Sequence, residues 1–157
     1  MSKHTKFSKG ERIAVACDHG GYELKELIKD ALKEKKFEIL DLGTNSSSSV
    51  DYPDYAELIG VSFSKNQVSG GVIICGTGIG ISIAANRFPC IRAALVHNEF
   101  TAEMARLHNN ANVIALGARV IDSQTAINCI HKFFSTQFEG GRHSRRVGKL
   151  GLLNISK

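Results

Sequence analysis

Short apolar runs alternate with amphipathic stretches along the chain, and the two patterns predict different elements. Residues 12–17 form an apolar run, and residues 71–75 are nearly continuously apolar, as expected for a parallel strand covered on both faces. Residues 37–42 predict another strand, which Gly43 ends, and residues 91–96 and 112–116 predict two more. The pattern therefore contains five strands.

Helical periodicity fills the intervals between these strands. One helix face carries Leu24, Leu27, Ile28, Ala31 and Leu32 at helical spacing. Pro53 suits the first turn of a second helix, whose inner face has Ala56, Ile59, Gly60 and Phe63. A third helix is expected over residues 98–108, and Asp122 or Ser123 can cap a long final one.

This alternation predicts an α/β fold, with a doubly wound five-stranded parallel sheet between two helical layers. We expect a Rossmann-like architecture with flavodoxin-type strand order. A single domain is expected over residues 12–150, ending in a basic helical tail. Residues 1–11 are expected to form a disordered basic leader without the apolar core of a signal peptide.

Composition agrees with a soluble globular domain, since 43% of the 157 residues are hydrophobic and 22% are charged. The sequence has no 18-residue apolar run, so no membrane contact is expected. The four cysteines, Cys17, Cys75, Cys90 and Cys129, are too widely spaced to suggest a disulfide framework or a zinc site. Free thiols favour the cytoplasm.

The net charge of +5 is concentrated at the two ends of the chain. Basic ends could contact nucleic acid, remain solvated, or bind a small anionic ligand. Composition does not choose among these three uses.

Candidate chemistry follows the strand ends, where ligands bind in parallel sheets. Asp18-His19 follows the first strand, Cys75-Gly76 the third, and His97-Asn98 the fourth. The helix after the fourth strand ends in His108-Asn109-Asn110. We expect all these groups to converge on one edge of the sheet.

The glycine-rich segment 76–80 is the sharpest single signal. Alternate glycines let backbone amides turn toward an anion, and the next helix adds its positive N-terminal end. The segment follows the third strand with G-x-G-x-G spacing and no Walker lysine, so nucleotide binding is the weaker interpretation.

Cys75 immediately precedes this loop, in a setting that favours a thiolate able to act as a base. An isolated cysteine is more often buried and inert, which is our interpretation of Cys17, Cys90 and Cys129. Arg142 and Arg146 share one helix face, suited either to a phosphate or to solvent.

Several blocks of the sequence closely resemble the type B ribose-5-phosphate isomerases. They are CDHGG (17–21), DYPDYA (51–56), CGTGIGISIAANRF (75–88), RLHNNANVIALGARV (106–120) and EGGRHSRRV (139–147). The resemblance extends from about Arg12 to Val147, in matching order.

The resemblance implies a homodimer, which could pair into a tetramer, with a site shared between subunits and no metal or organic cofactor. It implies interconversion of ribose 5-phosphate and ribulose 5-phosphate, with Cys75 as the base, Thr77 assisting and His108 opening the furanose ring. The implied substrate contacts are Asp18, His19, Tyr52, Gly76, Gly78, Ile79, Gly80, Asn109, Arg119, Arg142 and Arg146. Another branch of the family uses a downstream Glu as the base, but Gly80-Ile81-Ser82 offers no carboxylate.

Three alternatives stay open. The chain could instead isomerise a six-carbon sugar phosphate such as allose or galactose 6-phosphate, as some relatives do, although the RHSRR pattern and His108 favour the pentose. A non-catalytic nucleotide-binding module is a second alternative. Nucleic-acid binding is the third, and no recognition motif supports it.

Overall fold

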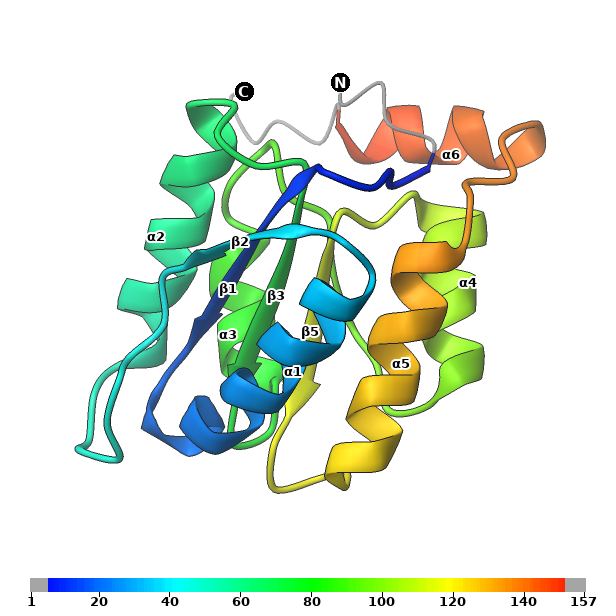
Figure 1. The fold of residues 1–157 in the computed structure, drawn as a ribbon. Helices are drawn as coiled ribbons and strands as arrows, with labels where there is room; N and C mark the ends of the chain where they lie inside the picture. Colours follow the sequence, from blue (N-terminus) through cyan, green and yellow to red (C-terminus); the bar gives the residue numbers. More distant parts are fainter. Residues whose placement is uncertain (1–5, 152–157) are drawn as a thin grey trace, which may run out of the picture.

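Five parallel strands form one sheet in the computed structural model, which describes residues 6–151 (Figure 1). The strand order is β2-β1-β3-β5-β4, and β3 occupies the centre. The strands are β1 (Arg12–Cys17), β2 (Glu38–Asp41), β3 (Gly70–Cys75), β4 (Ala93–Leu95) and β5 (Val113–Gly117).

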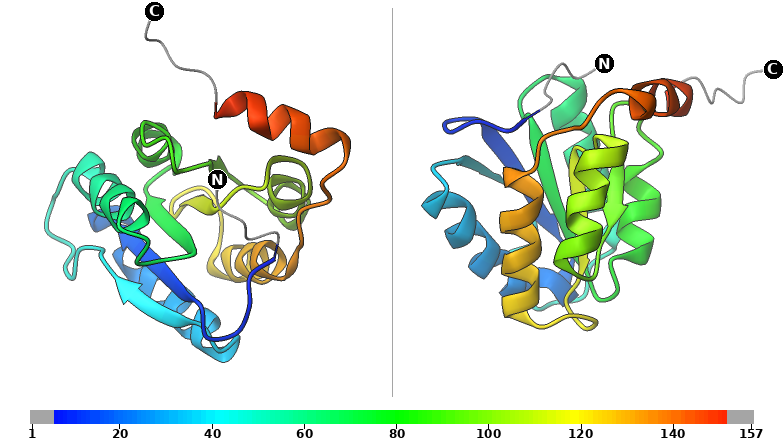
Figure 2. Two further views of the ribbon diagram at one scale, coloured as in Figure 1. Left: turned by 90° about the horizontal axis from the view of Figure 1, so that it is seen from above. Right: turned by 90° about the vertical axis from the view of Figure 1, so that its right-hand side faces the viewer.

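Helices cover both faces of this sheet. On one face lie α1 (Tyr22–Glu34), α4 (Glu99–Asn109) and α5 (Ser123–Ser135), and on the other lie α2 (Tyr52–Ser64) and α3 (Ile79–Ala85). A short 3-10 turn, η1 (His19–Gly21), precedes α1. The last helix, α6 (Arg142–Leu150), packs against α4 and lies across the amino-end edge of the sheet (Figure 2).

The predicted fold class is confirmed, but one side of the strand order differs from the flavodoxin order 2-1-3-4-5. In this chain β5 lies between β3 and β4. All five residues of β5 are buried, whereas the three residues of β4 are only partly buried. The fully buried strand therefore takes the interior position, and the short, partly buried one forms the edge.

The leader expected over residues 1–11 includes Phe7, which belongs to the core. Its side chain is 5% exposed, and its ring centroid lies 4.8 Å from that of Phe134. The guanidinium of the buried Arg106 lies 4.6 Å from the same ring centroid. The packed chain thus begins earlier than predicted, while residues 1–5 lie outside the described residues.

The helix boundaries follow the sequence signals closely. Asp122 caps α5 by accepting a hydrogen bond from the Thr125 amide at 2.8 Å, and Pro53 lies in the first turn of α2. Leu27 is an exception, since it was expected on the inner face of α1 but is 45% exposed. Within residues 6–151, each helix falls short of the length and apolar character that a membrane crossing needs.

The ammonium of Lys25 is completely buried between α1 and the chain that follows β2. It donates to Asp41 Oδ1 at 2.9 Å, to the Thr44 carbonyl at 2.9 Å and to Asn45 Oδ1 at 3.0 Å. Partial burial of Asp41 opposes its ionisation, but hydrogen bonds from Lys29 and Lys25 outweigh it and lower the pKa of this carboxyl. Lys25 therefore fixes the start of the loop that leads to α2.

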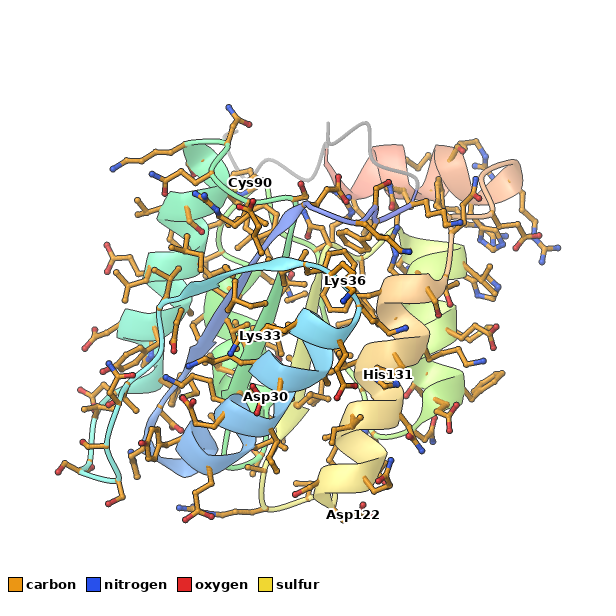
Figure 3. The ribbon with its side chains drawn as sticks, in the orientation of Figure 1. Asp30, Lys33, Lys36, Cys90, Asp122 and His131 are labelled. Carbon is orange, nitrogen blue, oxygen red and sulfur yellow. The ribbon has the colours of Figure 1, made fainter. Side chains whose placement is uncertain are left out.

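Replacing Lys25 by methionine should lower the free energy of unfolding by about 3 kcal/mol, because it leaves buried oxygen atoms without their donor. Urea unfolding at pH 7 measures this loss. Lys33→Met is the matched control, because Lys33 contacts Asp30 on the exposed side of α1 (Figure 3). The control should change stability by less than about 1 kcal/mol. Equal losses in the two variants would contradict the assignment.

Candidate active site

The chain leaves β1 and β3 in opposite directions at their carboxyl ends. After β1 it continues to β2 on one side, and after β3 it continues toward β4 on the other. Such a divergence leaves a crevice between the two loops, which is where open α/β sheets bind ligands. The loops that begin at Asp18 and at Gly76 border this crevice.

The glycine-rich loop directs a backbone amide at Cys75. Cys75 is the last residue of β3 and is 4% exposed, and its sulfur accepts a hydrogen bond from the Gly78 amide at 3.1 Å. Gly78 has a φ of 77°, and a Cβ there would lie 2.6 Å from Leu95 Cδ1 and 2.8 Å from the Leu116 carbonyl carbon. Only glycine fits this position, and an amide donor aimed at the sulfur stabilises negative charge there.

The next amide of the loop also donates internally. The Ile79 amide donates to Thr77 Oγ1 at 3.3 Å. Two of the amides expected to hold an anion, those of Gly78 and Ile79, therefore contact the side chains of Cys75 and Thr77 in this structure. The loop is organised around these two side chains.

Asp18 and His19 lie across the crevice from this loop. Asp18 Oδ1 accepts from the Gly20 amide at 2.9 Å, which forms the turn that starts η1. His19 Nδ1 accepts from the Val50 amide at 3.2 Å. A neutral His19 therefore carries its proton on Nε2, which leaves this nitrogen as a donor for a ligand.

Tyr52 and Arg119 also lie beside the glycine-rich loop. The Tyr52 ring covers Gly80 so closely that a Cβ there would lie 2.6 Å from Tyr52 Cζ. The Arg119 amide donates to the Gly76 carbonyl at 2.9 Å, which brings the loop after β5 alongside. A cavity of about 430 Å³ is lined by His19, Arg119, residues of the first half of α1 and Ser123 at the start of α5, and neither Tyr52 nor Cys75 lines it.

The structure thus brings ten of the expected site residues to the carboxyl edge of the sheet. They are Asp18, His19, Tyr52, Cys75, Gly76, Thr77, Gly78, Ile79, Gly80 and Arg119.

The other four expected residues form a second group at the opposite edge, so the predicted convergence on one edge holds for the residues after β1 and β3 but is wrong for His108 and Asn109. His108 and Asn109 end α4, which runs antiparallel to the strands over 11 residues. This length returns the chain by about 16 Å to the amino-end edge. Arg142 and Arg146 lie on α6, which packs beside the end of α4 (Figure 1).

Two residues that the sequence interpretation did not assign join this second group. The imidazole rings of His108 and His143 stack with centroids 4.3 Å apart and an angle of 11° between their planes. Glu139 Oε2 lies 3.4 Å from His143 Nε2 and 4.0 Å from His108 Nε2. The sequence offered one signal of this contact, because Glu139 and His143 are four residues apart, the spacing of neighbours on a helix face. The intervening Gly140-Gly141 gave no reason to expect a helical turn there.

The donor set of this trio could suggest a divalent metal, but its geometry does not fit one. The ligand atoms of His108, Glu139 and His143 lie within 4.8 Å of one another. The lone pair of an imidazole nitrogen lies in the ring plane, and two stacked, nearly parallel planes cannot both pass through a single ion. Metal binding would require the rings to unstack.

The remaining cysteines lie outside both groups. Cys17 and Cys129 are fully buried, as expected, and burial raises their pKa values to about 12 and about 11. Cys90 lies toward the amino-end edge, away from the glycine-rich loop (Figure 3).

Comparisons with known proteins agree with this arrangement. The family model described as Ribose/Galactose Isomerase matches residues 13–150. Ribose-5-phosphate isomerase B of Escherichia coli strain K12 is 44% identical over 137 residues, which cover 87% of this chain and 92% of that protein.

Solved structures of similar proteins share the whole fold. A ribose 5-phosphate isomerase from Thermotoga maritima is 47% identical, with a TM-score of 0.87 and coverage of 91% of this chain and 99% of that one. Ribose-5-phosphate isomerase B of Mycoplasma genitalium, solved with bound ribulose-5-phosphate, is 40% identical, with a TM-score of 0.89 and coverage of 96% and 100%.

Burial predicts a strong contrast in thiol reactivity within the folded protein. At pH 8 a pKa of about 12 leaves about one Cys17 in ten thousand as the reactive thiolate, and Cys129 is protected similarly. Iodoacetamide should therefore spare both until urea unfolds the chain, whereas the half-buried Cys90 reacts in the folded state. Peptide mass spectrometry measures the labelling. Labelling of Cys17 at the rate of Cys90 would contradict this prediction.

Proposed function

The chain belongs to the ribose/galactose isomerase family, and we propose that it interconverts ribose 5-phosphate and ribulose 5-phosphate with Cys75 as the base. The observation that carries this proposal is the hydrogen bond that the Gly78 amide donates to the Cys75 sulfur at the end of β3. We place the reaction in the cytoplasm, because all four thiols are free.

In this mechanism the Cys75 thiolate removes the proton from C2 of the open-chain aldose and returns it to C1. The intermediate enediolate carries a developing oxyanion, for which donors already in position are worth roughly 3–4 kcal/mol each. We assign these donors to the amides of Gly76 and Gly80, because those of Gly78 and Ile79 donate to Cys75 and Thr77 in this structure. The Thr77 hydroxyl assists the transfer of the protons. No redox partner is needed, because the two electrons of the C2–H bond stay within the sugar.

The substrate's phosphate supplies binding energy far from the reacting carbons. We assign it to His19, whose Nε2 is left as a donor because Nδ1 accepts from the Val50 amide, and to Arg119, Arg142 and Arg146. Asp18 and Asn109 are assigned to sugar hydroxyls, and Tyr52 borders the pocket. His108 serves as the acid/base that opens the furanose ring.

The separation of the two groups leads us to propose that two subunits form each site. Cys75 lies at one edge of the sheet and His108 at the other, so a second copy must bring its His108, Asn109, Arg142 and Arg146 to the first. Exposed apolar side chains on the neighbouring helices α2 and α3 offer a surface for that copy. They are Leu58, Val61, Ile79 and Ile83, which are 38–57% exposed.

Two substitutions should separate the chemical step from ring opening. Cys75→Ala should lower the turnover of ribose 5-phosphate by about 100- to 10,000-fold, and equally lower exchange of the C1 hydrogen of ribulose 5-phosphate with solvent. His108→Asn should lower turnover of the cyclic substrate by about 100-fold and leave C1 exchange within about threefold. Coupled assays and NMR in heavy water measure the two quantities.

Cys90→Ala is the matched control, because it removes a thiol remote from the loop and should leave both rates unchanged. Near-normal turnover by Cys75→Ala would refute the proposed base. A large preference for allose 6-phosphate over ribose 5-phosphate would refute the proposed substrate.

Mixing two inactive variants tests the shared site. Equal amounts of Cys75→Ala and His108→Asn subunits are unfolded together and refolded, so that half of the dimers are mixed. Each mixed dimer has one site with both residues intact. Activity should return to about a quarter of the wild-type value. Size-exclusion chromatography monitors dimer formation. Dimers that form but stay at the activity of the separate variants would show that each chain supplies its own His108.

A further inference from the structure

The side chains of His108, Glu139 and His143 contact one another at the end of α4. His143 is 4% exposed and lies under the half-exposed ring of His108, against which it stacks. The Glu139 amide donates to the Leu107 carbonyl at 3.1 Å, which ties this backbone to the residue next to His108. The carboxylate is thus held near both rings by its own main chain.

The hydrogen bonding of His143 points to a neutral ring. Arg142 Nε donates to His143 Nε2 at 3.3 Å, so this nitrogen acts as an acceptor. Desolvation, followed by repulsion from His108, lowers the pKa of His143. The hydrogen bond from Arg142 and the lowered pKa both favour a neutral His143.

The Glu139 carboxylate then lacks a donor on the nearer imidazole. Its Oε2 lies 3.4 Å from His143 Nε2, but that nitrogen already accepts from Arg142. The other imidazole nitrogen near it is His108 Nε2, at 4.0 Å. A movement of about 1 Å brings this pair to the length of a charge-assisted hydrogen bond.

We propose that Glu139 is a positioning residue for His108, which orients the imidazolium and favours its protonated form, while His143 supports the ring from one face. The charged groups around the pair are Glu139, on the segment before α6, and His143, Arg142 and Arg146 on α6. At His143 the charge of Glu139 opposes the effect that these two arginines have on the pKa of that ring. The proposal rests on the proposed role of His108 as the acid/base of ring opening.

Glu139→Gln removes the negative charge with little change of shape at a position that is 54% exposed, so the variant should fold normally. Turnover of ribose 5-phosphate should fall about 10-fold, and the alkaline decline of turnover should begin about half a pH unit lower, because His108 loses its proton more easily. C1 exchange of ribulose 5-phosphate should stay within about twofold. High salt, which screens exposed charges, should narrow the difference from the wild type.

Two further variants define the outcome. Glu139→Asp retains the charge and should restore the wild-type pH profile in part, whereas Glu34→Gln removes an equal charge from the exposed end of α1 and should have no effect. If the pH profile of turnover is unshifted in Glu139→Gln while His108→Asn is still impaired on the cyclic substrate, the positioning role of Glu139 is overturned and the proposed role of His108 stands. Unimpaired turnover in His108→Asn would instead overturn the proposed role of His108.

Discussion

Each strand of this sheet runs in the same direction, and the helix that follows it returns the other way. A residue at the end of a strand and a residue at the end of the next helix therefore lie on opposite edges of the domain. Cys75 occupies the first kind of position and His108 the second. The proposed chemistry requires both side chains at one sugar and therefore two chains, so the dimer that we propose is a consequence of the topology rather than of an added interface motif.

The carboxyl edge is organised by hydrogen bonds that connect stability to the site. Lys25 fixes the chain at Thr44 and Asn45, and the same loop later supplies the Val50 amide that sets the tautomer of His19. On the other side of the crevice, the left-handed conformation of Gly78 turns its amide onto the Cys75 sulfur. Weakening the Lys25 contacts should therefore affect ligand binding as well as unfolding.

Local patterns predicted the local structure well, because caps and periodicity act over a few residues. Asp122 and Pro53 marked helix starts that the structure contains. The exchange of β4 and β5 was not readable, since both segments look similarly apolar and their order depends on burial across the sheet. The position of His108 was misjudged although the reversal of direction in a β–α unit implies it. Phe7 was missed because a single aromatic residue in a basic segment shows no periodicity.

The contact between Glu139 and His143 depends on a turn that periodicity cannot describe. Gly140 and Gly141 have φ values of 73° and 51°, and this turn brings the carboxylate back toward the first turn of α6. A carboxylate beside Arg142 and Arg146 weakens their attraction for a phosphate, which is a cost at a site that binds an anionic sugar. The same carboxylate lies beside His108 Nε2 and, in the proposed role, orients that ring. Ring opening then gains a positioned acid, and this gain offsets the weaker attraction for the phosphate.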